Sequence, residues 1–428
     1  MRFLLVLLCL AVSYSSAYAE RAEFKFLKTV KVHELNAILN GERTEFLKDL
    51  PVDPSYVLPP ASKATNAVDL YTVRYYSNSP ELGGKEMLAS GLLALPTGAR
   101  DTNLKLIAYL HGTVFGKYEV PSFAFRKNNP SGEPHYAQAY ETRYMTALFA
   151  GNGYALMAPD YFGLGSGAAQ NEAYMMKRST AQGNYDLYLD VVNYLANEKN
   201  IHPSKFMVGG WSQGGLNATG FLEILEANKV NVRAAFTAAS PNDPYGMTNA
   251  TAFHPRASDA PWLSAVLALT AFSCENYQGP KGLAKEVIDP KYYPDMKKIY
   301  DRTLGGPLAL LQLLGTWIQE QVPFTGFLRA KYRNPAALAA SPFGECLSLN
   351  ETYRREFKTP LHMYYGLSDE VIRPLIGLLG DDYQHRITDS PGEPSSSKIK
   401  AFPVEGAGHR ETFLSASVAA KAWMDSLR

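Results

Sequence analysis

Cysteine, net charge and long apolar runs are all scarce in this 428-residue chain. Its 42 Lys and Arg against 41 Asp and Glu leave a formal net charge of +1. This balance gives no indication of a nucleic-acid partner or of an acidic membrane surface. Outside the N-terminus no segment is convincing as a membrane span, so we expect no stable membrane insertion. No clustered His, Cys and Asp predict a metal site, and no phosphate-binding loop occurs in a suitable context. We therefore expect no cofactor.

The three cysteines fall in two separate parts of the chain. Cys9 lies in an apolar N-terminal segment, whereas Cys274 and Cys346 share one predicted helical region. In an exported protein these two cysteines are candidates for a disulfide. The alternative is two unbridged buried thiols, because the sequence does not show whether their Cα atoms approach closely enough.

The first 19 residues have the pattern of a secretory signal peptide. Arg2 is followed by an apolar stretch over residues 3–12, and Ala17 and Ala19 supply a small-x-small cleavage site. We expect cleavage after Ala19, which leaves a neutral mature chain. An uncleaved anchor is the alternative, but the apolar stretch is too short to cross a bilayer. We therefore predict a secreted or periplasmic protein.

Gly210-Trp211-Ser212-Gln213-Gly214 lies between an apolar run at residues 205–208 and a helical pattern at residues 216–225. G-x-S-x-G between a strand and a helix is the nucleophile elbow. Glycines flank the serine because a Cβ at either position would collide with the neighbouring strand or helix. The turn is expected to expose the Ser212 hydroxyl above the sheet. It also directs the Gln213 backbone N–H and the helix N-terminus at the place of an oxyanion.

Short apolar strands alternate with helical patterns, which is typical of a mostly parallel α/β sheet flanked by helices. Residues 20–66 are interpreted as an N-terminal arm with one or two short helices, and a β-hairpin over residues 68–95 as one edge of the sheet. Further strands are expected at residues 103–110, 154–159, 205–208, 232–239, 359–366 and 398–403.

The alternation stops between residues 244 and 357, where the sequence is mostly helical and irregular. We interpret residues 244–357 as a helical lid inserted before the last two strands, so that the core consists of residues 20–243 and 358–428. The alternative is that these helices extend the core. The apolar stretch at residues 307–318 is too short for a membrane helix, and glycines and a proline open it.

An acid and a histidine follow Ser212 in the chain order of a hydrolase triad. Asp369 comes just after the strand at residues 359–366, and His409 lies in a glycine-flanked loop after the last strand. Three separate strand-end positions in this order predict that Ser212, Asp369 and His409 form a catalytic triad. In such a triad the histidine takes the serine proton and the aspartate orients the imidazole.

Two other polar residues at strand ends have structural interpretations. His111 opens His111-Gly112-Thr113, a loop expected to supply the second oxyanion donor from the backbone N–H of Thr113, with Gly112 as the alternative. As a base, His111 would break the required chain order, so we expect it to structure this loop. Asp160 is interpreted as a carboxylate that binds loop N–H groups rather than as the triad acid.

Together with the elbow, Gly366–Ile372 and Gly406–His409, these motifs resemble the α/β-hydrolase superfamily, and within it the secretory lipases of fungi and their bacterial relatives. The resemblance covers about residues 65–428. It also rests on Tyr109–Thr113, with Val120–Ser122 downstream, and on Ala158–Gly165. It implies lid-covered hydrolysis of acylglycerols or related esters, with Ser212, Asp369 and His409 as the triad. The best-known fungal lipases carry an acidic residue in the oxyanion loop, so His111–Thr113 favours a broader carboxylesterase.

Three functions remain open on the sequence. The first is a secreted serine carboxylesterase or lipase acting on a small-molecule or lipid ester. The second is a peptidase or polyester depolymerase on the same fold, and the third is a non-catalytic binding protein, against which the intact triad argues. Asn249 and Asn350 head glycosylation sequons, and Asn217 heads another that we discount because it is expected on the helix after the elbow. The sequence leaves the oligomeric state open.

Overall fold

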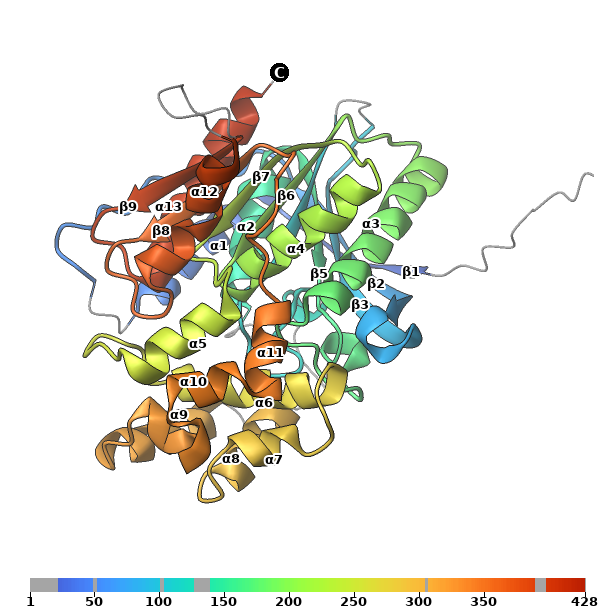
Figure 1. Ribbon diagram of the computed structural model, residues 1–428. Helices are drawn as coiled ribbons and strands as arrows, with labels where there is room; N and C mark the ends of the chain where they lie inside the picture. Colours follow the sequence, from blue (N-terminus) through green and yellow to red (C-terminus); the bar gives the residue numbers. More distant parts are fainter. Residues whose placement is uncertain are drawn as a thin grey trace, which may run out of the picture.

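A twisted sheet with helices on both faces forms the body of the molecule (Figure 1). The computed structural model describes residues 22–48, 52–100, 104–126, 139–304, 307–388 and 398–427. The predicted signal peptide at residues 1–19 lies outside this part of the chain. Within it the sheet has the strand order β1-β2-β3-β5-β4-β6-β7-β8-β9.

The first strands of the sheet pair antiparallel and the others parallel. Antiparallel pairing joins β1 to β2, β2 to β3 and β3 to β5. Strands β5, β4, β6, β7, β8 and β9 then follow side by side in parallel. The strands are β1 (Ala22–Val30), β2 (Val68–Ser79), β3 (Lys85–Pro96), β4 (Lys105–Leu110), β5 (Tyr154–Pro159), β6 (Lys205–Trp211), β7 (Val232–Ala238), β8 (Leu361–Gly366) and β9 (Ile399–Val404).

The N-terminal part of the sheet differs from the prediction. Residues 22–30 are an edge strand paired with β2, so the predicted hairpin is not the edge, and one long helix, α1 (Val32–Leu47), follows. β1 is mostly solvent-exposed, and Glu23, Lys25 and Lys28 interrupt its apolar residues. A strand that buries so little surface has no continuous apolar run by which it could be recognised.

Each face of the sheet has its own hydrophobic core. In β4, Leu106 and Ala108 belong to the core beneath α3 (Lys177–Lys199) and α4 (Gln213–Ala227). Ile107 and Tyr109 belong to the core under α1, α2 (Tyr140–Phe149) and α13 (His409–Ser426). Because both faces are covered, the parallel strands are apolar at every position rather than at alternate ones.

Residues 244–357 form a helical layer beyond the sheet, below it in the view of Figure 1. They lie between β7 and β8, as predicted for the insertion. Its helices are α5 (Pro244–Phe253), α6 (Leu263–Tyr277), α7 (Leu283–Val287), α8 (Tyr293–Asp301), α9 (Pro307–Gln319), α10 (Pro335–Ala339) and α11 (Pro342–Leu349). A further helix, α12 (Pro374–Thr388), connects β8 to β9.

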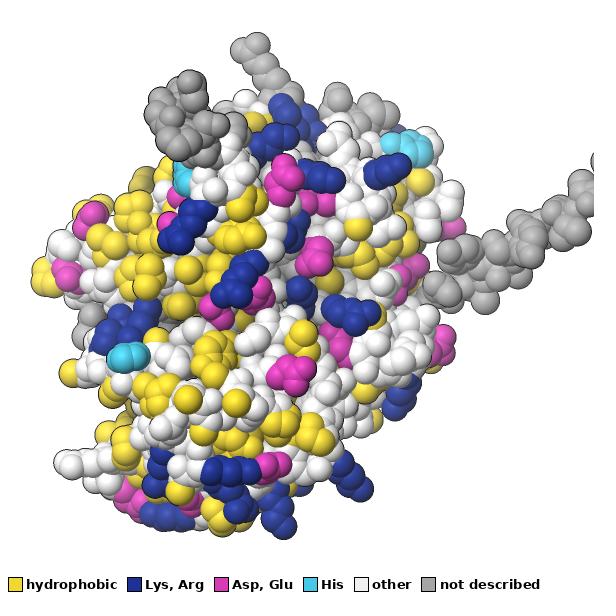
Figure 2. All heavy atoms as spheres, in the orientation of Figure 1, with side chains coloured by type: hydrophobic (Ala, Val, Ile, Leu, Met, Phe, Trp, Pro, Cys, Tyr) yellow, Lys and Arg dark blue, Asp and Glu magenta, His cyan; other side chains and the backbone are white. Residues whose placement is uncertain are grey.

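The surface of this face mixes hydrophobic side chains with charges of both signs. Figure 2 shows Lys and Arg spread over the whole of this face, near its top as well as over the lower part where α7 and α8 lie. No helix among the described residues is both long and apolar enough to cross a membrane. The apolar helix α9 is thus part of the insertion and packs through Leu310, Leu314 and Trp317.

Candidate active site

Ser212 sits on a sharp turn between β6 and α4. Its backbone has φ 56° and ψ −124°, a left-handed conformation that a non-glycine residue rarely adopts. The turn is held because Ser212 N–H donates to Ala238 O on β7 at 2.9 Å. A Cβ on Gly210 would strike the backbone of Gly214, and a Cβ on Gly214 would lie 2.6 Å from His111 O. Both glycines are therefore required by close backbone approach, as predicted.

The structure brings Ser212, His409 and Asp369 into one line of contacts. His409 Nε2 lies 2.9 Å from Ser212 Oγ, and His409 Nδ1 lies 3.0 Å from Asp369 Oδ2. All three side chains are buried. The other carboxylate oxygen, Asp369 Oδ1, accepts the backbone N–H groups of Val371 and Ile372 at 2.8 and 2.7 Å. This fixes the carboxylate on both sides, so that it can hold the imidazole in one orientation.

His409 is the first residue of α13 rather than part of the loop in which the sequence placed it. Its backbone N–H donates to Glu370 Oε2 at 3.0 Å, and its carbonyl accepts from Trp211 Nε1 at 3.1 Å. Burial, the largest single influence, lowers the pKa of His409. The charge of Asp369 and its hydrogen bond, with the charge of Glu370, outweigh burial and raise that pKa above its ordinary value. The carboxylate of Asp369 therefore stabilises the protonated form of His409.

The loop after β4 begins beside the start of α4, where a Cβ on Gly214 would lie 2.6 Å from His111 O, and it carries the two candidate oxyanion donors. Gly112 N–H is engaged, because it donates to Glu141 Oε1 at 2.8 Å. Thr113 is therefore the remaining candidate of the pair, together with Gln213 at the start of α4. The Thr113 Oγ1 lies 2.7 Å from Tyr174 Oη, which ties the loop to the buried segment before α3.

His111 is a structural residue of this loop. Its Nδ1 lies 2.7 Å from Gly112 O and its Nε2 3.4 Å from Asp160 O, and its ring stacks on Tyr161 at 4.3 Å. Burial lowers the pKa of His111 to about 4, so its ring is neutral at ordinary pH. Both ring nitrogens of His111 contact backbone carbonyl oxygens, and neither contacts the Ser212 hydroxyl, in agreement with the sequence interpretation.

Asp160 is also structural, as the sequence indicated. Its Oδ1 accepts the Ser122 backbone N–H at 2.8 Å, and its Oδ2 accepts the hydroxyls of Ser90 and Ser122. The carboxyl is fully buried, and burial raises its pKa against these hydrogen bonds. Asp160 thus connects the segment at Ser122 to Ser90 of β3, whereas His409 contacts Asp369.

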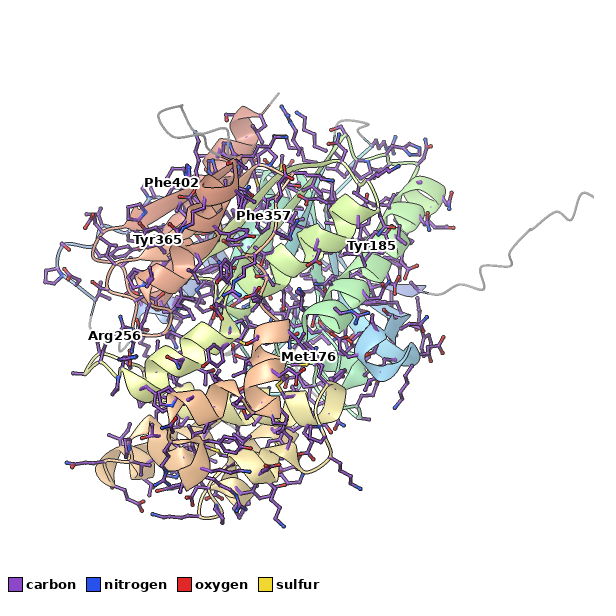
Figure 3. All side chains as sticks on the ribbon, in the orientation of Figure 1. Met176, Tyr185, Arg256, Phe357, Tyr365 and Phe402 are labelled. Atoms are coloured by element: carbon purple, nitrogen blue, oxygen red, sulfur yellow. A yellow bond between two sulfur atoms is a disulfide. The ribbon has the colours of Figure 1, made fainter. Side chains whose placement is uncertain are left out.

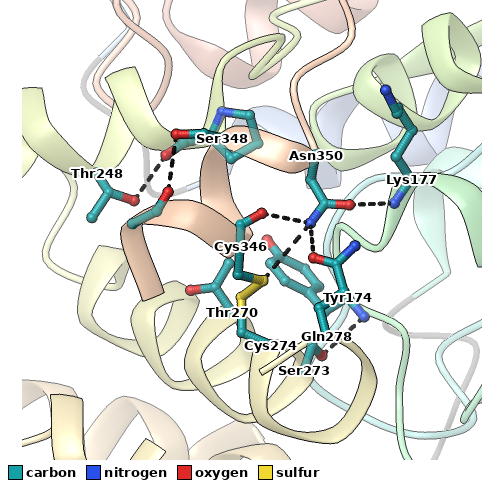
Figure 4. The surroundings of a disulfide bond; sticks show 12 residues. Tyr174, Lys177, Thr248, Thr270, Ser273, Cys274, Gln278, Cys346, Ser348 and Asn350 are labelled. Carbon is teal, nitrogen blue, oxygen red and sulfur yellow. Dashed lines mark hydrogen bonds between the residues drawn. A yellow bond between two sulfur atoms is a disulfide. The ribbon is translucent and has the colours of Figure 1, made fainter. Parts of the chain in front are cut away.

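The inserted helices are tied to the core beside the site. Cys274 on α6 and Cys346 on α11 form a disulfide with their Cα atoms 6.0 Å apart, as proposed from the sequence (Figure 4). Asn350 donates to Gln278 Oε1 and Cys346 O, while its Oδ1 accepts the Lys177 N–H of α3 at 2.8 Å. This asparagine is buried, so the sequon that it heads has no exposed side chain to modify.

A second connection reaches the loop of the triad acid. Arg256, just after α5, donates from Nη2 to Asp369 O at 2.9 Å and pairs with Asp259 (Figure 3). Asp259 also pairs with Arg373 after β8. The insertion thus helps to position the Asp369 loop.

A small apolar crevice of about 10 Å³, room for roughly one water molecule, lies within the insertion where it meets Met175 of the core. Two of its lining residues are chain neighbours of residues near the site. Leu263 follows Trp262, whose ring centroid is 6.4 Å from that of His409, and Met175 follows Tyr174. The other lining residues are Pro244, Met247, Thr248, Thr251, Val266, Leu267, Thr270 and Phe324. Among the described residues no group of His, Cys, Asp and Glu is placed to hold a metal ion.

Two carboxyl groups of the site were not identified from the sequence. Glu141 on α2 accepts from the oxyanion loop, and Glu370 accepts the backbone N–H of His409. Glu370 is adjacent to Asp369 and so could have been suspected. Glu141 offers only a weak signal, an acidic residue in the first turn of a helix, which is most often a favourable interaction with the helix dipole.

Comparisons with known proteins bear on the fold. The model of the prolyl oligopeptidase family matches residues 140–240, from α2 through the elbow to β7. No curated protein matches the chain. Among solved structures, one from Legionella pneumophila is similar with a TM-score of 0.73 and 20% identity, over 94% of this chain and 98% of that chain.

Two further similar structures are enzymes by description. The rice cell wall degrading esterase LipA from Xanthomonas oryzae has a TM-score of 0.72 and 17% identity, over 95% of this chain and 98% of its own. Candida antarctica lipase A has a TM-score of 0.59 and 15% identity, over 90% of this chain and 77% of its own. At these identities the likeness shows the fold. The chain is an α/β-hydrolase-fold protein, structurally similar to bacterial esterases and to a fungal lipase, as the sequence motifs indicated.

Proposed function

We propose that the chain is a serine hydrolase that cleaves carboxylic esters through an acyl-enzyme. The observation that carries the proposal is the continuous contact from Ser212 Oγ through His409 to Asp369, on a strained elbow. A hydroxyl within hydrogen-bond reach of an imidazole that is itself oriented by a carboxylate is the arrangement of an activated nucleophile. A binding protein would have no use for the strain at Ser212.

The reaction follows from these contacts. Ser212 Oγ attacks the carbonyl carbon while His409 Nε2 takes the hydroxyl proton, and the carbonyl electron pair moves to oxygen. When the tetrahedral intermediate collapses, the alcohol oxygen leaves with the proton from His409, and the acyl group stays on Ser212. A water molecule then attacks the acyl carbon and gives its proton to His409; as the second tetrahedral intermediate collapses, His409 returns that proton to Ser212 Oγ, and the acid is released. Asp369 stabilises the imidazolium in both halves.

The oxyanion would be held by the backbone N–H groups of Gln213 and Thr113. Gln213 is the first residue of α4, so its N–H is one of the unsatisfied donors at a helix N-terminus. The engagement of Gly112 N–H by Glu141 supports the assignment of the second donor to Thr113. Each such donor commonly contributes on the order of 3 kcal/mol to the transition state.

We propose that the acyl chain binds along this apolar crevice, which must widen to admit it because its interior has room for about one water molecule. Its lining is predominantly hydrophobic, and its walls follow Trp262 and Tyr174, which contact the site. Each buried methylene of the acyl chain would add about 0.8 kcal/mol of binding. We propose that the inserted helices act as a lid and that the substrate enters along their boundary with the core.

Export is the second part of the proposal. The N-terminal signal pattern and the Cys274–Cys346 disulfide support a secreted or periplasmic protein, because disulfides persist in oxidising compartments. Edman sequencing of the mature protein tests it, and the expected first residue is Glu20.

Initial rates on p-nitrophenyl esters, from about two to about sixteen acyl carbons, test the ester activity and give the depth of the crevice. Ser212→Ala should abolish turnover on all of them. Ser240→Ala is the matched control, because it removes a buried hydroxyl near the elbow that bonds Asn242 instead of His409. Turnover that survives in Ser212→Ala would overturn the proposal.

Peptide cleavage is the second candidate function, favoured by the prolyl oligopeptidase match over residues 140–240. The same triad chemistry cleaves amides, so substrate choice depends on the pocket. Proline-containing peptide p-nitroanilides measured beside the esters separate the two candidates. A higher kcat/KM on the anilides would replace the esterase assignment.

A further inference from the structure

Glu141 is a fully buried carboxyl group that the mechanism above does not use. It lies in the first turn of α2, and its Oε1 accepts two hydrogen bonds. Gly112 N–H donates at 2.8 Å and Tyr109 Oη at 3.0 Å. The same oxygen therefore holds both the end of β4 and the first residues of the oxyanion loop.

The oxyanion loop is confined from the other side by Trp211. A Cβ on Gly112 would lie 2.7 Å from the Trp211 ring and 3.2 Å from Glu141 Oε2. The loop backbone thus passes through a gap between one indole and one carboxyl group. Only glycine fits, and only one orientation of the Gly112 peptide directs its N–H at Glu141.

The loss of this acceptor would leave Gly112 N–H buried without a partner, which is strongly unfavourable. The loop would then rotate to find another acceptor, and the neighbouring peptide would rotate with it. That neighbour carries the Thr113 N–H, the proposed oxyanion donor. The position of Glu141 Oε1 and the direction of the Thr113 N–H are therefore coupled through the Gly112 Cα, which joins their two peptide groups, and the second peptide group is also held at Gly112 O by His111 Nδ1.

We propose that Glu141 is a positioning residue of the oxyanion loop: it holds Gly112 N–H so that Thr113 N–H faces the reacting carbonyl. This inference rests on the proposed function. The position of the acceptor oxygen matters here, and the negative charge does not.

The surroundings of Glu141 support this distinction. Burial raises its pKa to about 8, against the lowering effect of the Gly112 and Tyr109 hydrogen bonds and of the His409 charge. The hydroxyl groups of Tyr109 and Tyr161 and the imidazole of His409 are the titratable groups that face it. Near neutral pH the group is a neutral acid whose carbonyl oxygen still accepts. A fixed carboxylate behind the loop would instead oppose the oxyanion.

Two isosteric changes separate position from charge. Glu141→Gln keeps an acceptor oxygen in place and removes the ionisable group. Glu141→Asp keeps a carboxyl group but withdraws it by one methylene, out of reach of Gly112. Tyr109→Phe is the matched control, because it removes the other donor to the same oxygen and leaves the Gly112 contact.

Kinetics on a short p-nitrophenyl ester give the expected pattern. Glu141→Asp should lower kcat by about 100-fold with KM within about threefold of wild type, because an oxyanion contact is made mainly in the transition state. Glu141→Gln and Tyr109→Phe should stay within about fivefold of wild type. Thermal unfolding of each variant confirms that the folded protein is being compared. An active Glu141→Asp, or a Glu141→Gln that loses as much, would overturn the inference.

The rate of Ser212 labelling by a fluorophosphonate supplies a readout that needs no ester turnover, because the phosphonyl oxygen occupies the same oxyanion position. The labelling rates should rank the variants as kcat does. If wild type labels but cleaves no ester, the proposed function fails and the labelling rates still decide the role of Glu141. If wild type does neither, both proposals are overturned.

Discussion

Gly214→Ala should disable the site without touching any proposed catalytic side chain. Gly214 is the second residue of α4, and its position is packed against the end of β4. A Cβ there would lie 2.6 Å from His111 O and closer still to Leu110 O. Carbon–oxygen contacts in folded proteins begin at about 3.3 Å. The His111 contact alone therefore requires a displacement of about 0.7 Å, and the Leu110 contact requires more.

Both obstacles are backbone atoms at the end of a central strand, so they cannot rotate away. The displacement must fall on the elbow and the start of α4, which carry Ser212 and the Gln213 N–H. A misplacement of about 1 Å costs about 100-fold in rate. Overpacking of this kind also destabilises by about 1–3 kcal/mol. We expect kcat/KM on a p-nitrophenyl ester to fall by about two orders of magnitude.

Gly41→Ala is the control for the loss of a helical glycine. Gly41 lies in α1, with nothing within 4 Å of its added Cβ. Alanine there should stabilise the protein by about 0.5–1 kcal/mol and leave the kinetics unchanged. The measurements are urea unfolding and steady-state rates on the three proteins. A Gly214→Ala variant with wild-type rate and stability would refute the reasoning on the elbow.

Three further predictions concern charge and cross-linking. Asp369→Asn should lower kcat by on the order of 10⁴-fold. It should also move the acidic limb of the kcat/KM pH profile to lower pH, because His409 must be neutral to accept the serine proton and Asp369 contributes to its raised pKa. An acidic limb at the wild-type position would contradict this. The Cys274→Ala/Cys346→Ala double variant should lose about 4 kcal/mol in urea unfolding, since the bond closes a 72-residue separation, and an unchanged midpoint would count against the bridge. Burial raises the pKa of Glu141 to about 8 in the folded protein, so its contribution to stability is present below the unfolded-state pKa of 4.5 and is lost as pH rises through about 8. The Tm of Glu141→Gln relative to that of wild type should therefore increase from about pH 5 to about pH 9. A Tm difference that does not change with pH would exclude the burial effect.

The parallel strands could be located from the sequence because burial on both faces leaves a continuous apolar run. The run at residues 154–159 coincides with β5, and the run at residues 205–208 extends through two glycines to Trp211 in β6. The start of the helix that carries His409 could not be located from the sequence in this way. The start of this helix at His409, where the sequence predicted a loop, depends on Glu370, which accepts the His409 N–H from a different part of the chain.

The sequence by itself determined the parallel α/β architecture, the elbow at Ser212, and the chain order of Ser212, Asp369 and His409. Those features are local, because each depends on residues within one strand and the loop that follows it. Tertiary structure alone decided that β1 forms the edge of the sheet, that Asn350 is buried against Lys177, and that Glu141 holds Gly112. The physical reason is that a hydrogen bond between distant segments leaves no periodicity in either segment, so it exists only once the sheet has brought them together.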